Sequence, residues 1–190
     1  MKQFDDEKIK KAITMLLEAV GEDPTREGLI DTPKRVAKFY NEALEGMKYT
    51  DDELVAMFDK QFALPTSNNM VCVRNIPLFS FCEHHWALMY NMRATIAYIP
   101  KDRVIGLSKI SRIADMVAKR LQLQERICES IAYILKEILK TNTVAVIIEG
   151  EHSCVAARGI KKIGSPTRTE VVSGDFCSNP IMMQRLYSQI

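Results

Sequence analysis

Apolar residues recur every three to four positions through the first third of the chain, a spacing that predicts helices. Aspartate caps helices and glycine ends them, so the first helix is expected between Asp5 or Asp6 and Gly21. The second should begin at Asp31, which precedes a proline suited to a first helical turn, and end at Gly46. We expect this helix to carry its apolar residues inward: Val36, Phe39, Tyr40, Ala43 and Leu44.

The rest of the chain mixes helical periodicity with runs of β-branched residues. Thr50 and Glu53 have capping-box spacing and open a short helix through Phe58. Beyond it we expect strands from Met70 to Phe79 (bent near Pro77), at 93–99, 143–148 and 167–172, and helices after Gly106-Leu107-Ser108, at 124–139 and after Asn179-Pro180. Strands with a helix pair inserted between them indicate an α+β fold with an antiparallel sheet.

Length and composition are those of a single globular domain. The chain has 190 residues, 47% hydrophobic and 26% charged, with a formal net charge of +2. This near balance gives no electrostatic case for a nucleic-acid or membrane partner. No apolar stretch reaches 18 residues and the first residues lack the pattern of a signal peptide, so we expect a cytoplasmic protein. Its five cysteines are then expected to be core thiols or metal ligands rather than disulfides.

All three histidines lie within three residues of a cysteine, in Cys82-Glu-His84-His85 or in His152-Ser-Cys154. Two residues between Cys82 and His85 let both side chains converge on one ion. His152 and Cys154 are two apart on an expected strand, which would place them on one face. Thiolate and imidazole together are ligands that suit zinc.

The number of ligands decides what such a zinc site does. Four protein ligands would close it as a structural site, whereas three would leave a position for water, which zinc acidifies. Spacing alone does not say which histidines coordinate. Zinc deaminases are the alternative, but their Pro-Cys-x-x-Cys motif does not occur in this chain.

Further polar groups surround these motifs in the sequence. Lys109 and Arg112 are three apart in the first turns of an expected helix, where free N–H groups and the helix dipole favour a phosphate, although a solvated helix start has the same pattern. Gln124 and Glu125 form either an exposed face or a reader of the donor edge of a base. Arg158 supplies another cation close behind the second metal motif.

Together these motifs resemble zinc-dependent GTP cyclohydrolase I. The resemblance rests on several segments in the family's order: Gly21–Gly28, Asp31–Val36, Cys82-Glu-His-His85, Ile105–Lys109, Gln124-Glu-Arg126 and His152–Gly159. It implies that Cys82, His85 and Cys154 bind Zn²⁺ and that water takes the fourth position.

The same resemblance implies roles for the other residues. His84 and His152 match proton-handling groups, and Ser108 matches a residue that contacts the substrate and serves the sugar rearrangement. The remaining matches are to triphosphate-binding cations (Lys109, Arg112, Arg158), a guanine-reading pair (Gln124, Glu125) and a phosphate contact from a neighbouring subunit (Arg74). Zinc-activated water would attack C8 of guanine in GTP while His152 protonates N7, and ring opening would release formate and lead to a pterin triphosphate.

The implied architecture is the tunnelling fold, in which the sheets of neighbouring subunits join into a barrel. A single domain over 1–190 would contain an N-terminal helical region (1–65) and the catalytic core (66–190), and two five-membered rings would form a homodecamer. Where the family has a Gly-Lys turn this chain has Asn91-Met92, and asparagine tolerates the left-handed conformation of a hairpin turn.

Two other functions fit part of the pattern. A non-catalytic, zinc-binding regulator would keep the fold, but it would have no need of His84, His152 and the phosphate-binding cations. Another tunnelling-fold enzyme would act on a pterin or a deazapurine, but such relatives do not resemble the paired metal motifs. The sequence leaves open whether the product feeds folate, another pterin cofactor or a deazaguanine pathway.

Overall fold

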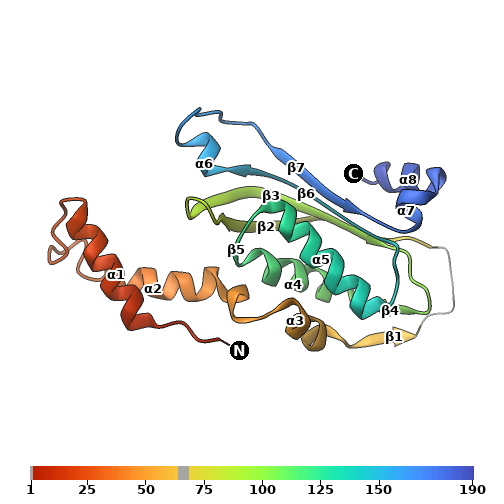
Figure 1. The fold of residues 1–190 in the computed structure, drawn as a ribbon, viewed down its shortest axis with the longest axis horizontal. Helices are drawn as coiled ribbons and strands as arrows, with labels where there is room; N and C mark the ends of the chain where they lie inside the picture. The colour runs from red at the N-terminus through yellow and green to blue at the C-terminus, as the bar shows by residue number, and fades with distance from the viewer. Residues whose placement is uncertain (1, 64–68) are drawn as a thin grey trace.

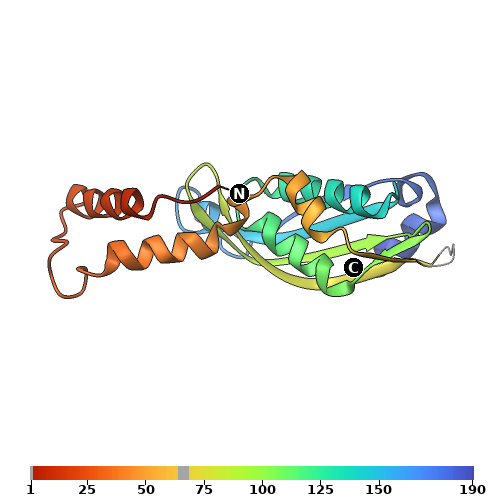
Figure 2. The ribbon, with the colours of Figure 1, turned by 90° about the horizontal axis from the view of Figure 1, so that it is seen from below.

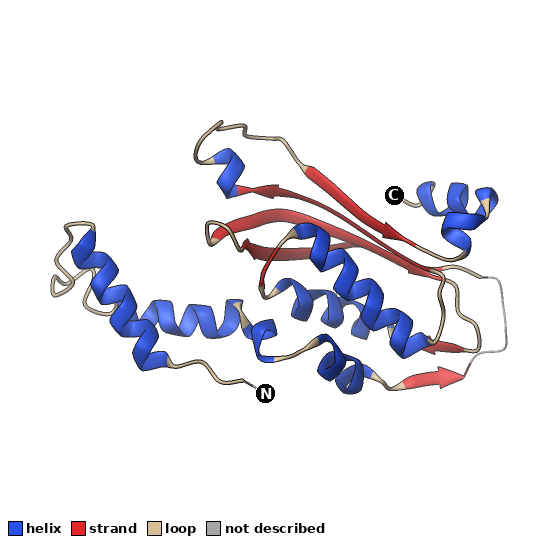
Figure 3. Cartoon of the chain, in the orientation of Figure 1, coloured by secondary structure: helices blue, strands red, loops and turns tan. Residues whose placement is uncertain are grey.

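A computed structural model describes residues 2–63 and 69–190, which form an α+β fold (Figure 1). The predicted boundary between 65 and 66 lies outside the described residues. The main sheet has five strands in the order β5-β2-β3-β6-β7 (Figure 3). Their bounds are β2 Val71–Cys82, β3 Ala87–Tyr98, β5 Leu121–Gln122, β6 Val144–His152 and β7 Thr167–Val172. Strands β2, β3, β6 and β7 pair antiparallel, as predicted.

The two-residue strand β5 departs from the predicted antiparallel sheet. It pairs parallel to the end of β2, with Phe81 opposite Leu121 and Cys82 opposite Gln122. Two residues carry no periodicity, so sequence reasoning missed this strand. The same holds for β1 (Gln61–Ala63) and β4 (Arg103–Ile105), which form a separate antiparallel pair.

The inserted helix pair covers one face of the sheet and forms the main core. Helix α4 (Leu107–Ala118) begins close to the predicted cap, and helix α5 (Gln124–Leu139) spans the predicted range. Eight of their apolar residues are fully buried: Ile110, Ile113, Ala114, Val117, Ile127, Ile131, Ile134 and Ile138. They pack with β2, β3 and β6 residues in one continuous cluster, which fixes both helix starts relative to the strand ends.

The C-terminal helices α7 (Asp175–Ser178) and α8 (Pro180–Tyr187) pack through a second cluster that contains Phe176, Leu186 and Ile147 of the sheet. Asn179 caps α8, as predicted, because its side chain accepts hydrogen bonds from the first turn. In Figure 1 these helices lie at the opposite end of the molecule from α1 and α2.

The N-terminal helices α1 (Asp6–Ala19) and α2 (Thr32–Ala43) extend beyond the end of the sheet (Figure 2). The expected caps on α1 and α3 (Asp51–Phe58) form: Asp5 accepts from Lys8, and Thr50 and Glu53 make a capping box. A 3₁₀ turn, η1 (Glu45–Lys48), follows α2. None of the described helices is long and apolar enough to cross a membrane.

The expected inward face of α2 is only partly buried. Ala43 and Leu44 are buried, but Phe39 is 51% exposed, and α1 buries no residue at all. Helical periodicity correctly predicts an apolar stripe, but no element within residues 2–63 and 69–190 covers much of it.

The strand around Asn91 is longer than predicted. β3 begins at Ala87 rather than Arg93, and the hairpin turn lies at 83–86 instead of at Asn91-Met92. Asn91 does adopt the left-handed conformation, with φ of 51°, but it does so inside a β-bulge between Tyr90 and Arg93. The asparagine therefore bends a strand rather than closing a hairpin.

Candidate functional site

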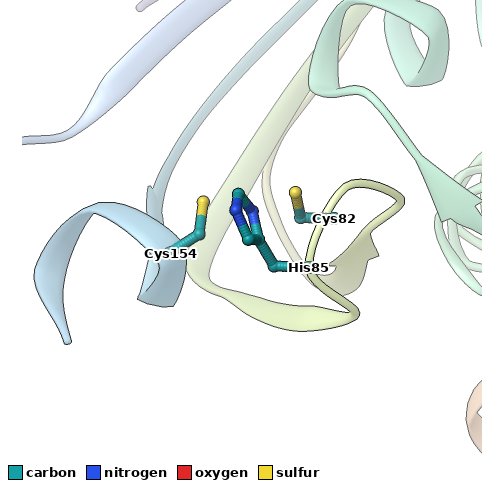
Figure 4. Close-up of side chains that lie close together, drawn as sticks. All are labelled: Cys82, His85 and Cys154. Atoms are coloured by element: carbon teal, nitrogen blue, oxygen red, sulfur yellow. The ribbon is translucent and has the colours of Figure 1, made fainter. Parts of the chain in front are cut away.

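Cys82, His85 and Cys154 converge at one end of the sheet (Figure 4). One ligand atom from each lies within 4.8 Å of the other two, and the three side chains point toward one another. Cys82 ends β2, His85 lies in the following turn, and Cys154 lies in helix α6 (Ser153–Ala156) directly after β6. The pairing of β3 with β6 places Met89 opposite His152 and so brings the Cys82–His85 motif next to the His152–Cys154 motif.

The turn that carries His85 is fixed from several sides. The backbone N–H of Glu83 donates to the carbonyl of Gln122 at 3.3 Å, which continues the pairing of β2 with β5. The carboxylate of Glu83 accepts from Arg126 of α5 at 2.8 Å. Trp86 closes the turn with φ of 53°. These contacts orient His85 toward Cys82.

The predicted reason for the convergence of His152 and Cys154 is wrong. The strand ends at His152, and Cys154 lies in a short helix, so the two residues do not share a strand face. The helical turn instead redirects the chain and carries the Cys154 sulfur toward Cys82. The expected convergence still occurs, because the Cys154 thiol reaches Cys82 and His85.

The three donors fit a zinc ion. Burial raises the pKa of the Cys154 thiol, the adjacent Cys82 raises it further, and Arg158 opposes both effects. Two sulfurs this close repel each other as thiolates, and a divalent cation between them removes that cost. Two thiolates and one imidazole are a donor set for zinc rather than for magnesium or calcium. Three protein ligands leave one coordination position open.

His152 lies beside this cluster and is held by Gln124. Its Nε2 atom is 2.9 Å from Oε1 of Gln124, which is 1% exposed. Burial lowers the pKa of His152, and the negative charge of Glu125 acts in the opposite direction. Glu125 itself is exposed in the first turn of α5, next to the histidine.

Arg158 and His84 also lie at this end of the sheet. Nη1 of Arg158 is 2.8 Å from Nε2 of His85, so the arginine touches a predicted ligand. The His84 ring centroid is 6.3 Å from that of His85, and its side chain is exposed. The structure therefore brings together eight of the predicted site residues: Cys82, His84, His85, Gln124, Glu125, His152, Cys154 and Arg158.

The other predicted residues lie elsewhere. The first turns of α4 contain Ser108, Lys109 and Arg112. This helix follows β4 and therefore begins near the end of β3 that lies away from His85 (Figure 1). A strand of the length of β3 spans about 40 Å. Lys109 donates from Nζ to the backbone carbonyls of Phe58 and Lys60 at 3.0 and 2.9 Å, so it anchors the end of α3. Ser108 and Arg112 are exposed.

Arg74 lines a separate cavity of about 300 Å³, together with Arg93, Arg168, Glu149 and the last two residues. One of its guanidinium nitrogens donates to the carbonyl of Gln189 at 2.9 Å. Within one chain, Arg74 thus lies outside the Cys82–His85–Cys154 cluster, where the phosphate contact was expected.

Sequence reasoning missed Glu151, which connects the strand bulge to the loop behind Arg158. Its carboxylate accepts from the Asn91 side chain at 2.9 Å, from the Tyr90 hydroxyl at 3.3 Å and from the Gly164 backbone N–H at 3.2 Å. These hydrogen bonds lower the pKa of Glu151, that of Asn91 most of all, although burial opposes them. The only sequence signal was its place next to His152.

Comparison with known proteins agrees with this geometry. The sequence model described as GTP cyclohydrolase I matches residues 9–190. GTP cyclohydrolase 1 of Clostridium botulinum (strain Kyoto / Type A2) is 53% identical over 188 residues, 96% of each chain. The enzyme of the same name from Clostridium beijerinckii is 50% identical over 188 residues, covering 96% of this chain and 95% of that one. The chain belongs to the GTP cyclohydrolase I family.

Proposed function

We propose that this protein hydrolyses GTP to formate and 7,8-dihydroneopterin 3′-triphosphate, a first step toward a pterin, folate or deazaguanine product. The observation that carries the proposal is the meeting of Cys82, His85 and Cys154 beside His152, from segments about 70 residues apart in the chain. Relatives named GTP cyclohydrolase 1 at 50% identity and more support the same reaction.

Cys82, His85 and Cys154 would hold zinc. When bound, zinc supplies a Lewis acid that lowers the pKa of water at its open position to about 7, and thus a nucleophile for C8 of guanine. The hairpin turn and α6 keep the three donors converged. Both elements are tied to the sheet by the β2–β5 and β3–β6 pairings.

His152 would donate a proton to N7 of guanine as the ring opens. It lies two residues from a proposed ligand, and burial lowers its pKa, which makes its protonated form a stronger acid. Glu125 would accept from the N–H groups on the pyrimidine edge of the base, since an ionised carboxylate is purely an acceptor. His84, exposed in the turn, would move a proton in a later step.

The triphosphate would be bound by cations from two copies of the chain. Arg158 lies at the proposed zinc cluster, whereas Ser108, Lys109 and Arg112 begin α4 far from it. A site between subunits would combine Arg158 of one chain with the start of α4 of another without a movement of either. Ser108 would then serve the sugar rearrangement. Arg74 would add a phosphate contact from a neighbouring chain.

Free edges in the sheet support this assembly. Among the described strands β7 pairs on one side only, and β5 covers just two residues of β2. Pairing of such edges between subunits protects them and would close a barrel of the tunnelling fold, with two five-membered rings forming a decamer. The apolar groove beside α1, about 620 Å³ in volume, offers further surface for subunit contact.

The proposal is tested by substrate choice. We expect purified protein with zinc to convert GTP to formate and a pterin that fluoresces after oxidation, and to leave a pterin substrate such as dihydroneopterin unchanged. Turnover of the pterin alone would favour another tunnelling-fold enzyme. GTP binding without formate release would favour the non-catalytic regulator.

A further inference from the structure

We propose that Gln124 is a positioning residue that fixes the orientation and the tautomer of His152, and that it does not read the guanine itself. This inference rests on the proposed role of His152 and replaces the guanine-reading role expected for Gln124. It follows from the hydrogen bonds of one buried side-chain amide.

The amide nitrogen of Gln124 has no capacity left for a substrate. It donates to the backbone carbonyl of Ile148 at 3.0 Å, to that of Thr167 at 2.9 Å and to the hydroxyl of Thr169 at 3.1 Å. An amide NH₂ carries two hydrogens, and three acceptors already share them. With 1% of the residue exposed, the side chain presents no surface to a ligand.

These acceptors also determine which way the amide faces. Two of them are backbone carbonyls, which can only accept. If the nitrogen and oxygen of the Gln124 amide were exchanged, the amide oxygen would face both carbonyl oxygens with no hydrogen between them. Oε1 must therefore be the atom that faces His152, at 2.9 Å from its Nε2. Since Oε1 can only accept, Nε2 of His152 must carry a hydrogen.

The consequence for His152 is a defined tautomer. With hydrogen on Nε2, Nδ1 of the neutral ring is the acceptor nitrogen. The ring plane is held as well, because backbone carbonyls attach Gln124 to β6 through Ile148 and to β7 through Thr167. The base-reading role then belongs to Glu125, which is exposed.

The test uses zinc-loaded protein labelled with ¹⁵N in its three histidines. Comparison with the spectrum of His152→Ala identifies the signals of His152. At a pH where the ring is neutral, we expect the ¹⁵N shifts of His152 to show hydrogen on Nε2. Gln124→Met removes the acceptor at nearly constant volume and should abolish that tautomer preference. Thr169→Val, the control, removes one hydrogen-bond partner of the Gln124 amide and should keep it.

Kinetics separate positioning from base reading. Gln124→Met should lower kcat for GTP about 10–100-fold, a part of what general acid catalysis contributes, with little change in KM. Thr169→Val should change neither by more than a small factor. A large rise in KM with kcat unchanged, or hydrogen on Nδ1 of His152 in the unsubstituted protein, would overturn the inference. The ¹⁵N measurement needs no turnover, and its only variant is a folded His152→Ala for assignment, so it decides the tautomer even if GTP proves not to be the substrate.

Discussion

Nη1 of Arg158 lies 2.8 Å from Nε2 of His85, so a predicted phosphate-binding cation contacts a predicted zinc ligand. Arg112, predicted to bind the same triphosphate, lies in α4, which begins after β4 and thus near the end of β3 opposite to His85. We infer that the two arginines of a single chain do not bind one substrate. This separation predicts that each site combines the His85 end of one chain with the α4 start of another.

Mixed oligomers test that arrangement. Arg112→Glu and Arg158→Glu should each raise KM for GTP, because each places a carboxylate against the phosphates. Co-expression of the two variants should restore normal KM at about a quarter of the sites, since each site draws its two halves from a random mixture of subunits. The measurement is GTP turnover at low GTP in the co-purified mixture.

A matched control uses two residues from the same end. Arg158 and His152 both lie near the proposed zinc ligands of one chain, so a mixture of Arg158→Glu with His152→Ala should contain no complete site. Equal recovery in both mixtures, or none in either, would refute the shared site.

Zinc content should depend on two cysteines and not on a third. Cys82→Ala and Cys154→Ala each remove one of three protein ligands and are expected to leave the purified protein with little zinc. Cys177 is exposed and lies outside the cluster, so Cys177→Ala should keep one zinc per chain. Metal analysis decides the assignment, and full retention in both cluster variants would disprove it.

His152→Ala should keep zinc and fold but lose about 10²–10⁴-fold in turnover, because it removes the proposed general acid. Circular dichroism and metal analysis of the same sample show whether the loss is chemical rather than structural. Turnover near that of the unsubstituted protein would exclude a proton-transfer role for this histidine.

Cys128 should resist alkylation in the folded protein. Burial raises its pKa to about 11, although the Thr169 hydroxyl partly opposes the effect. At pH 8 almost no thiolate is present, whereas exposed Cys177 should react readily with iodoacetamide. Mass spectrometry should find Cys128 modified only after unfolding, and comparable labelling of both cysteines in the native protein would contradict this.

The same shift predicts a loss of stability in alkaline solution. The unfolded thiol ionises near its ordinary value of 9.0, while the folded thiol stays neutral to about 11. Between these values the unfolded state binds fewer protons, so the free energy of unfolding falls as pH rises. Cys128→Ala should show a weaker fall than the unsubstituted protein in urea denaturation at pH 9 to 11.

Periodicity was enough to predict the longer elements. The bounds of α5 and β7 match the predicted ranges, because many consecutive residues of each follow one spacing. The strand β5 and the helix α6 were not predictable in this way. Leu121 and Gln122 become a strand only because β2 lies beside them, and Cys154 turns inward only after β6 has paired with β3.

The candidate site shows the same division. Clustered histidines and cysteines predicted that the two motifs meet, since metal ligands must share one centre, and the family resemblance indicated which side chains converge. Nothing local to Gln124 indicated that its amide would bond to the middle of β6 and the start of β7, because those partners are 24 to 45 residues away. The role of Glu151 depends on a bulge at Asn91 that is defined by tertiary pairing.

A zinc ion held by Cys82, His85 and Cys154 is proposed to enable this chain to open the guanine ring of GTP. The most direct test strips the protein of metal and titrates zinc back while formate and oxidised pterin are measured together. We expect no formate without zinc, and then formate and pterin in equal amounts that rise until one zinc per chain is bound. Formate release by the stripped protein, or no release at full zinc occupancy, would contradict it.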